Sequence, residues 1–167
     1  AGNSSQITDG AAMLLMASRD AVAKYNLPVL GRLVDTQWSG LDPAQMGLGP
    51  AYAAAPLLSR NHLAANDVDI YEINEAFAGQ VLSCLAAWDD PEFCRDELGF
   101  DEALGQPDLN KINVDGGAIS IGHPVGASGA RIVLHALNAL KQNDGRRAIA
   151  TLCIGGGQGG AMLLERE

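Results

Sequence analysis

Apolar runs of strand length alternate with stretches of helical spacing along most of this chain. In its C-terminal third, apolar side chains recur at Val133, Leu134, Leu137 and Leu140, which is the spacing of one helix face. The pattern predicts strands at residues 29–36, 68–73, 148–154 and 161–164, and helices at residues 17–25, 51–62 and 75–88 and from residue 130 onward. Such alternation implies βαβ units, and therefore an α/β fold with a mixed, mostly parallel sheet and helices on both faces.

Two segments stand apart from this alternation. The apolar run 11–16 predicts a buried strand or the start of a helix. It is followed by helix 17–25 and then by a break at Leu27-Pro28, as if both elements completed a sheet that belongs to something upstream. Residues 89–109 are acidic and irregular, so we expect a surface excursion there with a short helix at residues 91–98.

Composition narrows the class of protein. The chain has 167 residues, enough for one domain with its own core, and a net charge of -9, which argues against nucleic acid as a partner. Its apolar runs are far shorter than the roughly 20 residues that cross a bilayer, so no membrane partner is expected. Three cysteines without CxxC spacing predict reduced thiols and a cytoplasmic location.

His123 is the first candidate for chemistry. It lies in a glycine-rich stretch, with Gly122 immediately before it and Gly126 shortly after, and Pro124 stiffens the backbone that follows. Histidine exchanges protons near neutral pH, and glycine leaves room for a ligand to approach the backbone. The alternative is a histidine that only satisfies backbone groups in a tight loop.

Cys153 is the second candidate. It ends an apolar predicted strand and precedes the run Gly155-Gly156-Gly157. A buried, inert thiol is the ordinary interpretation of such a cysteine. However, open α/β sheets bind ligands at the carboxyl ends of their strands, and the N–H groups after Cys153, including that of Gly155, could surround a developing oxyanion.

Asn74 begins a third motif, Asn74-Glu75-Ala76-Phe77, directly after a predicted strand. Asn is a favoured helix N-cap and Glu suits the first helical turn, so a structural role explains this motif when it is taken alone. The functional alternative places the Asn74 amide at the same sheet edge as His123 and Cys153.

The remaining candidate motifs give weaker evidence of a functional site. The stretch from Met46 to Pro50 lacks the lysine and the spacing of a phosphate-binding P-loop. His62 and His135 have no matched partner in the sequence, which favours surface or core roles. No spacing of acidic residues predicts a metal site.

Taken in order, these pieces resemble the thiolases almost from end to end. The resemblance is carried by five motifs, at residues 1–5 with 9–12, 46–50, 74–78, 116–131 and 153–160. It implies a thiolase-like C-terminal domain and reversible Claisen chemistry, in which coenzyme A (CoA) cleaves a 3-ketoacyl-CoA into acetyl-CoA and a shortened acyl-CoA. The CoA thioester is then a substrate, and no cofactor is expected.

The resemblance also implies roles for individual residues. His123 would deprotonate a nucleophilic cysteine and help to bind the thioester oxygen, and Cys153 would carry the proton to or from the acetyl carbanion. Asn74 would hold a water that forms one oxyanion hole with His123, and the Gly155 N–H would contribute to a second. The positions that match the pantetheine channel are Ser5, Met46 and Phe77.

One expected part of the family pattern is missing. No residue matches the motif of the acyl-carrying cysteine, and neither Cys84 nor Cys94 lies in a suitable context. We therefore expect residues 1–27 to end an N-terminal thiolase half and residues 28–167 to form the C-terminal domain. The missing half would be a partner, the full-length protein a homo-oligomer, and the chain alone inactive.

Two other interpretations remain open. A free-standing, non-catalytic module that binds acyl-CoA or pairs with a separate N-terminal subunit would share the same motifs. The related ketosynthases are disfavoured, because they typically have a second histidine at the position of Cys153.

Overall fold

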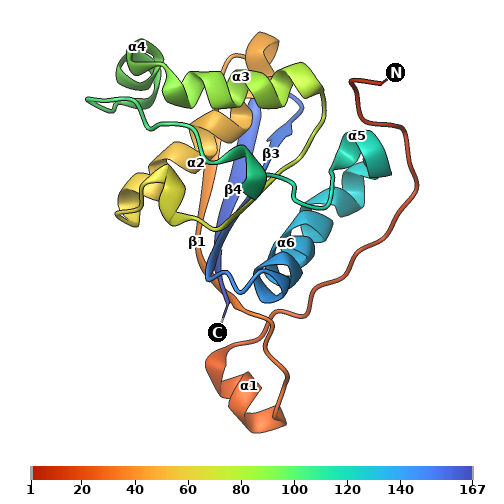
Figure 1. Ribbon diagram of the computed structural model, residues 1–167. Coiled ribbons are helices and arrows are strands. Elements are labelled where there is room, and N and C mark those ends of the chain that lie inside the picture. The colour runs from red at the N-terminus through yellow and green to blue at the C-terminus, as the bar shows by residue number, and fades with distance from the viewer. Residues whose placement is uncertain (1, 167) are drawn as a thin grey trace.

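The computed structural model, which describes residues 2–166, contains one four-stranded sheet. Its strands are β1 (Arg32–Gly40), β2 (Ile70–Ile73), β3 (Arg147–Ile154) and β4 (Gln158–Glu165), in the spatial order β1-β4-β3-β2 (Figure 1). The pair β2–β3 is parallel, and the pairs β3–β4 and β4–β1 are antiparallel.

The sheet is thus mixed, as predicted, but the expectation that it is mostly parallel was wrong. The reason is local: only the turn at residues 155–157 separates β3 from β4. So short a connection closes a hairpin, whereas a parallel pair needs a crossover of a dozen or more residues.

Helices cover both faces of the sheet, as predicted. One face packs against α2 (Gly49–Arg60) and α3 (Ala78–Asp89), and the other packs against α6 (Val125–Gln142) (Figure 1). Because strand side chains alternate between faces, Ile149 lies in the core beneath α2 and α3, while Ala148 and Ala150 lie in the core beneath α6.

Most of the predicted elements are confirmed, with shifted ends. Helix α3 begins at Ala78 and α6 begins at Val125, compared with the predicted residues 75 and 130. The remaining elements are short: α1 (Arg19–Tyr25), α4 (Pro91–Phe93), α5 (Ala118–Ile121), the 3-10 turns η1 (Pro43–Leu48), η2 (Ala65–Asp67) and η4 (Leu109–Lys111), and the π-helical turn η3 (Cys94–Leu98). The acidic excursion therefore contains the expected short helical segment, formed by α4 and η3. None of the described helices is long and apolar enough to cross a membrane.

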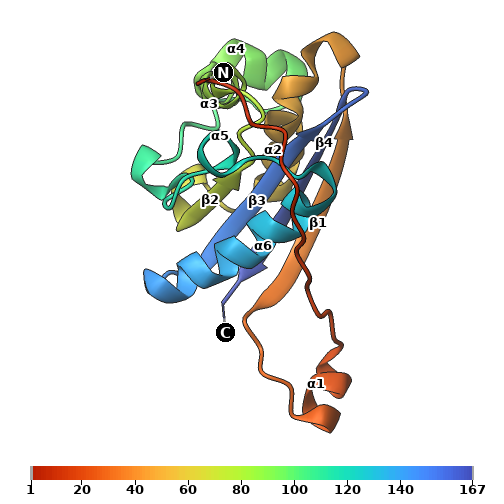
Figure 2. The same ribbon diagram turned by 90° about the vertical axis from the view of Figure 1, so that its right-hand side faces the viewer.

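The N-terminal segment contradicts one expectation. Residues 11–16 form neither a buried strand nor a helix: the side chains of Met13 and Leu15 are 88% and 80% exposed. The segment runs past α6 to α1, which stands away from the sheet (Figure 2). Within the described part of the chain no strand pairs with residues 11–16, so their backbone groups lack the partners that a strand requires.

Backbone contact at a glycine fixes α2 against the sheet. Gly159 of β4 lies against the backbone of Gly49, the first residue of α2, and a Cβ at position 159 would overlap the Gly49 carbonyl. Helix and strand approach so closely only because neither residue has a side chain.

We expect Gly159→Ala to lower the free energy of unfolding by about 1–3 kcal/mol, because the added methyl group must push two backbones apart. Gly129→Ala is the matched control: a Cβ there meets open space in a helix interior, so it should stabilise by about 0.5–1 kcal/mol. Urea unfolding of both variants measures the difference. Equal stability of the two variants would contradict the close-contact explanation.

Candidate active site

Two strand ends meet where the candidate residues gather. Asn74 directly follows β2, and its backbone N–H donates to the carbonyl of Thr151 in β3 at 3.0 Å. Cys153 lies two residues further along β3, on the same face as Thr151. The parallel pairing of β2 and β3 therefore puts Asn74 and Cys153 at one edge of the sheet.

The Asn74 amide and the His123 ring are neighbours, with 3.5 Å between Asn74 Nδ2 and His123 Nε2. On the other side of the ring, His123 Nδ1 lies 2.6 Å from Ser128 Oγ. The Ser128 hydroxyl donates its single hydrogen to the Pro124 carbonyl, at 3.1 Å. With that hydrogen used, Ser128 Oγ accepts a hydrogen bond from the Nδ1–H group, and in this tautomer the lone pair of the neutral imidazole is on Nε2, facing Asn74.

Two causes hold the pKa of His123 below its ordinary value. Burial penalises the charged ring, and the nearby positive charge of Arg131 lowers the pKa further. The Arg131 guanidinium is itself held by the Gly122 carbonyl, at 2.8 Å. At neutral pH the ring is therefore the neutral form, which can accept a proton at Nε2.

Asn74 does not cap a helix, so its structural interpretation was wrong. Helix α3 begins four residues later, with Phe77 at its N-cap and no side-chain cap hydrogen bond. The Asn74 side chain is 2% exposed, and among the described residues no donor reaches its Oδ1 atom. A buried amide oxygen without a partner is costly, which points to a group or water that completes this site.

Cys153 is a buried thiol, 7% exposed, and burial raises its pKa. It is one of three free cysteines in the chain, as the odd count predicted. The turn after it is tight, with positive φ at Gly156 and Gly157, while Gly155 is exposed at its start. Cys153 is therefore a neutral thiol beside an accessible backbone turn.

The N-terminal segment joins two of the motifs. The Ser5 N–H donates to the Ala76 carbonyl at 3.0 Å, and the neighbouring Ser4 forms an isolated bridge with Phe77. The Gln6 carbonyl accepts the His123 N–H at 3.0 Å. Ser5 and Phe77 are thus adjacent and Phe77 is half exposed, whereas Ala1, the first residue of the predicted motif, lies outside the described residues.

Met46 is half-buried in η1, the turn that packs against α3. The neighbouring Gly47 carbonyl accepts a hydrogen bond from the Cys84 thiol of α3, at 3.3 Å. The same turn contacts β3, the strand that carries Cys153. Met46 therefore lies on the α3 side of the sheet edge.

Glu75 and Asn113 brace the site, and the sequence analysis did not find this pair. Asn113 makes hydrogen bonds with both the N–H and the carbonyl of Ile73, each at 2.9 Å, and donates to Glu75 at 2.9 Å. The Glu75 carboxylate also accepts the Ile119 N–H at 3.1 Å. The positive φ of Asn113 is invisible in the sequence, so its only signal was an Asn shortly before the motif at residues 116–131.

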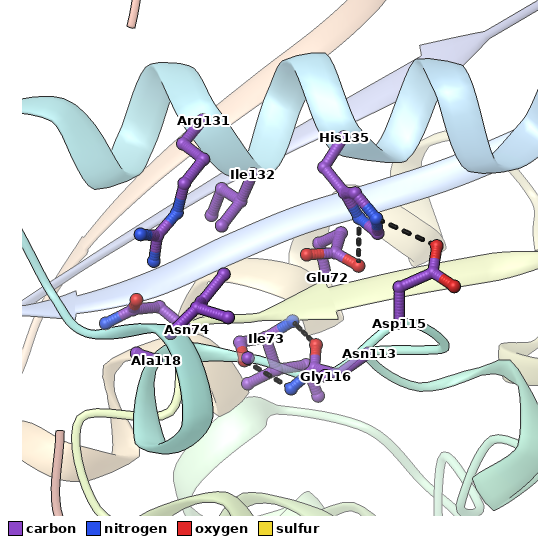
Figure 3. A pocket seen from close by; sticks show the side chains of 12 residues that line it. Glu72, Ile73, Asn74, Asn113, Asp115, Gly116, Ala118, Arg131, Ile132 and His135 are labelled. Carbon is purple, nitrogen blue, oxygen red and sulfur yellow. Dashed lines mark hydrogen bonds and ion pairs between the residues drawn. The ribbon is translucent and has the colours of Figure 1, made fainter. Parts of the chain in front are cut away.

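His135 has two side-chain partners in the structure, although the sequence suggested none. Its Nδ1 lies 2.9 Å from Glu72 of β2, and its Nε2 lies 3.0 Å from Asp115 (Figure 3). These residues, Asn74 and Arg131 line a cavity of about 260 Å³. The one available signal was Glu72 itself, a charged residue inside an otherwise apolar strand.

The arrangement supplies a base at His123 in contact with an amide donor at Asn74, and a neutral thiol at Cys153 on the α2 and α3 side of the same sheet edge. Such a set suits proton transfer and the stabilisation of a developing negative charge. Across the described residues, no group of three or more His, Cys, Asp or Glu side chains could hold a metal ion.

Comparison with known proteins finds thiolases, both by family model and by individual sequence. The family model "Thiolase, C-terminal domain" matches residues 27–166. The beta-ketoadipyl-CoA thiolase of Pseudomonas aeruginosa is 45% identical over 166 residues, and the peroxisomal 3-ketoacyl-CoA thiolase of Saccharomyces cerevisiae is 44% identical over 167 residues. The match covers 99% and 100% of this chain but 38% and 36% of those relatives.

Solved structures agree with the sequence relatives. The crystal structure of the dimeric peroxisomal thiolase of Saccharomyces cerevisiae has a TM-score of 0.83 at 44% identity, covering 99% of this chain and 37% of that one. Human mitochondrial 3-ketoacyl-CoA thiolase in complex with CoA has a TM-score of 0.82 at 37% identity, with 99% and 38% covered. The chain belongs to the thiolase family and corresponds to its C-terminal domain.

Proposed function

We propose that this chain is the C-terminal part of a thiolase, an acyltransferase that cleaves a 3-ketoacyl-CoA with CoA or runs the reverse condensation. The observation that carries the proposal is the contact between Asn74 and the Nε2 of a neutral His123, at the sheet edge where β3 ends just after Cys153. Its relatives include enzymes named as thiolases and one crystallised with CoA.

His123 and Asn74 form the first half of the proposed mechanism. In its neutral form, His123 takes the proton from a nucleophilic cysteine, whose thiolate attacks the 3-keto carbonyl carbon of the substrate. The bond between C2 and C3 then breaks: the shortened acyl group stays on the cysteine as a thioester until CoA removes it, and acetyl-CoA departs as its enolate. The Nε2 atom of His123 and the Asn74 amide face the thioester oxygen of acetyl-CoA, and an ordered water held by Asn74 gives the unpartnered Oδ1 its missing hydrogen bond. This arrangement stabilises the oxygen of the enolate.

Cys153 supplies the second half. Because its thiol is protonated, it gives a proton to the departing acetyl carbanion, and in the reverse direction its thiolate removes a proton from the acetyl group. The Gly155 N–H stands at the exposed start of the following turn and donates to the second oxyanion. Ser5, Met46 and Phe77 flank this edge and contact the pantetheine arm of CoA, which enters as substrate, with no cofactor.

A partner supplies what this chain lacks. The nucleophilic cysteine lies in an N-terminal half, against which the exposed apolar side chains of residues 11–16 pack. By analogy with its dimeric yeast relative, the complete protein is a homo-oligomer. A cytoplasmic location is supported by the three free thiols, although relatives also include peroxisomal and mitochondrial enzymes.

Joining this chain to the N-terminal part of the Saccharomyces cerevisiae peroxisomal thiolase tests the proposal. We expect the chimera to consume acetoacetyl-CoA in the presence of CoA, whereas the chain alone should be inactive because it has no nucleophile. Cleavage by the chain alone would contradict the missing-nucleophile argument. A folded chimera that binds CoA without cleaving would favour a non-catalytic binding module.

In the same chimera, Cys153→Ala should reduce cleavage by about 10²- to 10⁴-fold, the usual contribution of a general acid or base. Acylation of the nucleophile by acetyl-CoA, followed by mass spectrometry, should persist. Cys94→Ala is the matched control, because Cys94 is a buried thiol in the acidic excursion and should leave turnover unchanged. Near-normal cleavage by Cys153→Ala would rule out its role in proton transfer.

The protonation of His123 can be measured in the 167-residue chain by NMR of its ring. Its titration midpoint should lie below the ordinary histidine pKa, and Arg131→Gln should raise it by removing a nearby positive charge. Lys141→Gln removes a charge from the last turn of the same helix and should leave the midpoint unchanged. A midpoint in Arg131→Gln at or below that of the unmodified chain would contradict this explanation.

A further inference from the structure

Three residues on one face of α6 lie against the candidate site. Ser128, Arg131 and His135 follow the i, i+3, i+7 spacing and therefore lie along the same side of the helix. Ser128 contacts the His123 ring, and Arg131 donates to the Gly122 carbonyl. The catalytic scheme leaves the third member of this stripe, His135, without a role.

His135 uses both ring nitrogens. Nδ1 contacts a Glu72 oxygen at 2.9 Å, and Nε2 contacts an Asp115 oxygen at 3.0 Å. The Glu72 side chain is 5% exposed, whereas that of Asp115 is 58% exposed. Burial raises the pKa of Glu72 while His135 lowers it, so this carboxyl depends on the imidazole for its stabilisation.

The two carboxylates belong to the segments that carry the catalytic groups. Glu72 lies two residues before Asn74, and both side chains line the cavity beneath α6 (Figure 3). Asp115 lies in the turn that leads through α5 to His123. His135 thus joins β2, the strand that precedes Asn74, to the segment that leads to His123.

We propose that His135 is a positioning residue that sets the separation between the Asn74 amide and the His123 ring. It acts by holding Glu72 and Asp115 on either side of one imidazole, and it does not touch the substrate. The inference rests on the proposed function in that Asn74 and His123 act together there. The effect of His135 on the environment of Asn74 and His123 can nevertheless be measured without following catalytic turnover.

A purely structural role has a different signature. If His135 only neutralises a buried carboxylate, then replacing both members by apolar side chains removes the unpaired charge and restores the fold. The double variant Glu72→Leu/His135→Leu therefore separates stability from positioning. It can restore the stability of the fold, but it cannot restore the contact between residue 135 and Asp115.

The experiment uses the isotope-labelled 167-residue chain. The three histidines, His62, His123 and His135, make the ring spectrum easy to assign by substitution. The readouts are the ring nitrogen signals of His123, the side-chain amide signals of Asn74 and the urea midpoint of unfolding. His62→Asn is the matched control: it removes an exposed imidazole at a position with positive φ that Asn tolerates.

We expect His135→Leu to lower the urea midpoint and to displace the His123 and Asn74 signals, and the double variant to recover the midpoint while those signals stay displaced. His62→Asn should leave the spectrum of the site unchanged. Unmoved His123 and Asn74 signals in the double variant would overturn the proposal, and so would a displacement in His62→Asn as large as in His135→Leu. Because no readout involves CoA, a failure here is distinguishable from an inactive chimera.

Discussion

The parallel pairing of β2 with β3 determines where Asn74 and Cys153 lie. Parallel strands end at the same edge, so Asn74, which follows β2, and Cys153, the last residue but one of β3, lie at that edge although they are 79 positions apart in the printed sequence. A parallel pair also requires a long crossover, and this one contains α3, the acidic excursion, α5 and α6. His123 lies on that crossover and is returned to the same edge by the packing of α6 on the sheet.

The electrostatic character of the site follows from this burial. Low polarity disfavours both a charged imidazole and a thiolate, so the pKa of His123 is lowered and that of Cys153 is raised. Each shift leaves its group neutral. A neutral base and a neutral acid at one edge can exchange protons with a bound molecule in either direction, which agrees with a reversible reaction.

Local patterns predicted the elements of the fold well, because each strand or helix has its own short repeat of apolar and polar side chains. The residues at the sheet edge were also found, since glycines cluster where a backbone must turn sharply, as at Gly156 and Gly157. What the sequence could not reveal depends on distant partners. The Glu72–His135 contact spans 63 positions, and the run at residues 11–16 has no sheet to join within the described chain.

The direction of β4 and the start of α3 were missed for a related reason. The glycine content of the connection predicts a tight turn, but its length decides the direction of β4: three residues between β3 and β4 leave room only for a hairpin. Residues 74–77 carry good helix-start signals. They stay outside the helix, because the backbone at Ala76 and Ala78 forms hydrogen bonds with Ser5 and Asn3, and local helix propensity does not include these competing bonds.

The bonds of that N-terminal segment bear on the order in which the site forms. The backbones of Gln6 and His123, which are 117 positions apart in the sequence, are joined by a hydrogen bond, so this contact closes a long loop. Closing a long loop costs entropy before the contact returns any free energy, which delays such contacts relative to local ones. The helices and the β3–β4 hairpin can therefore form first. We expect the His123 loop to gain this anchor only once the N-terminal segment has docked, after the local elements that flank the loop have formed.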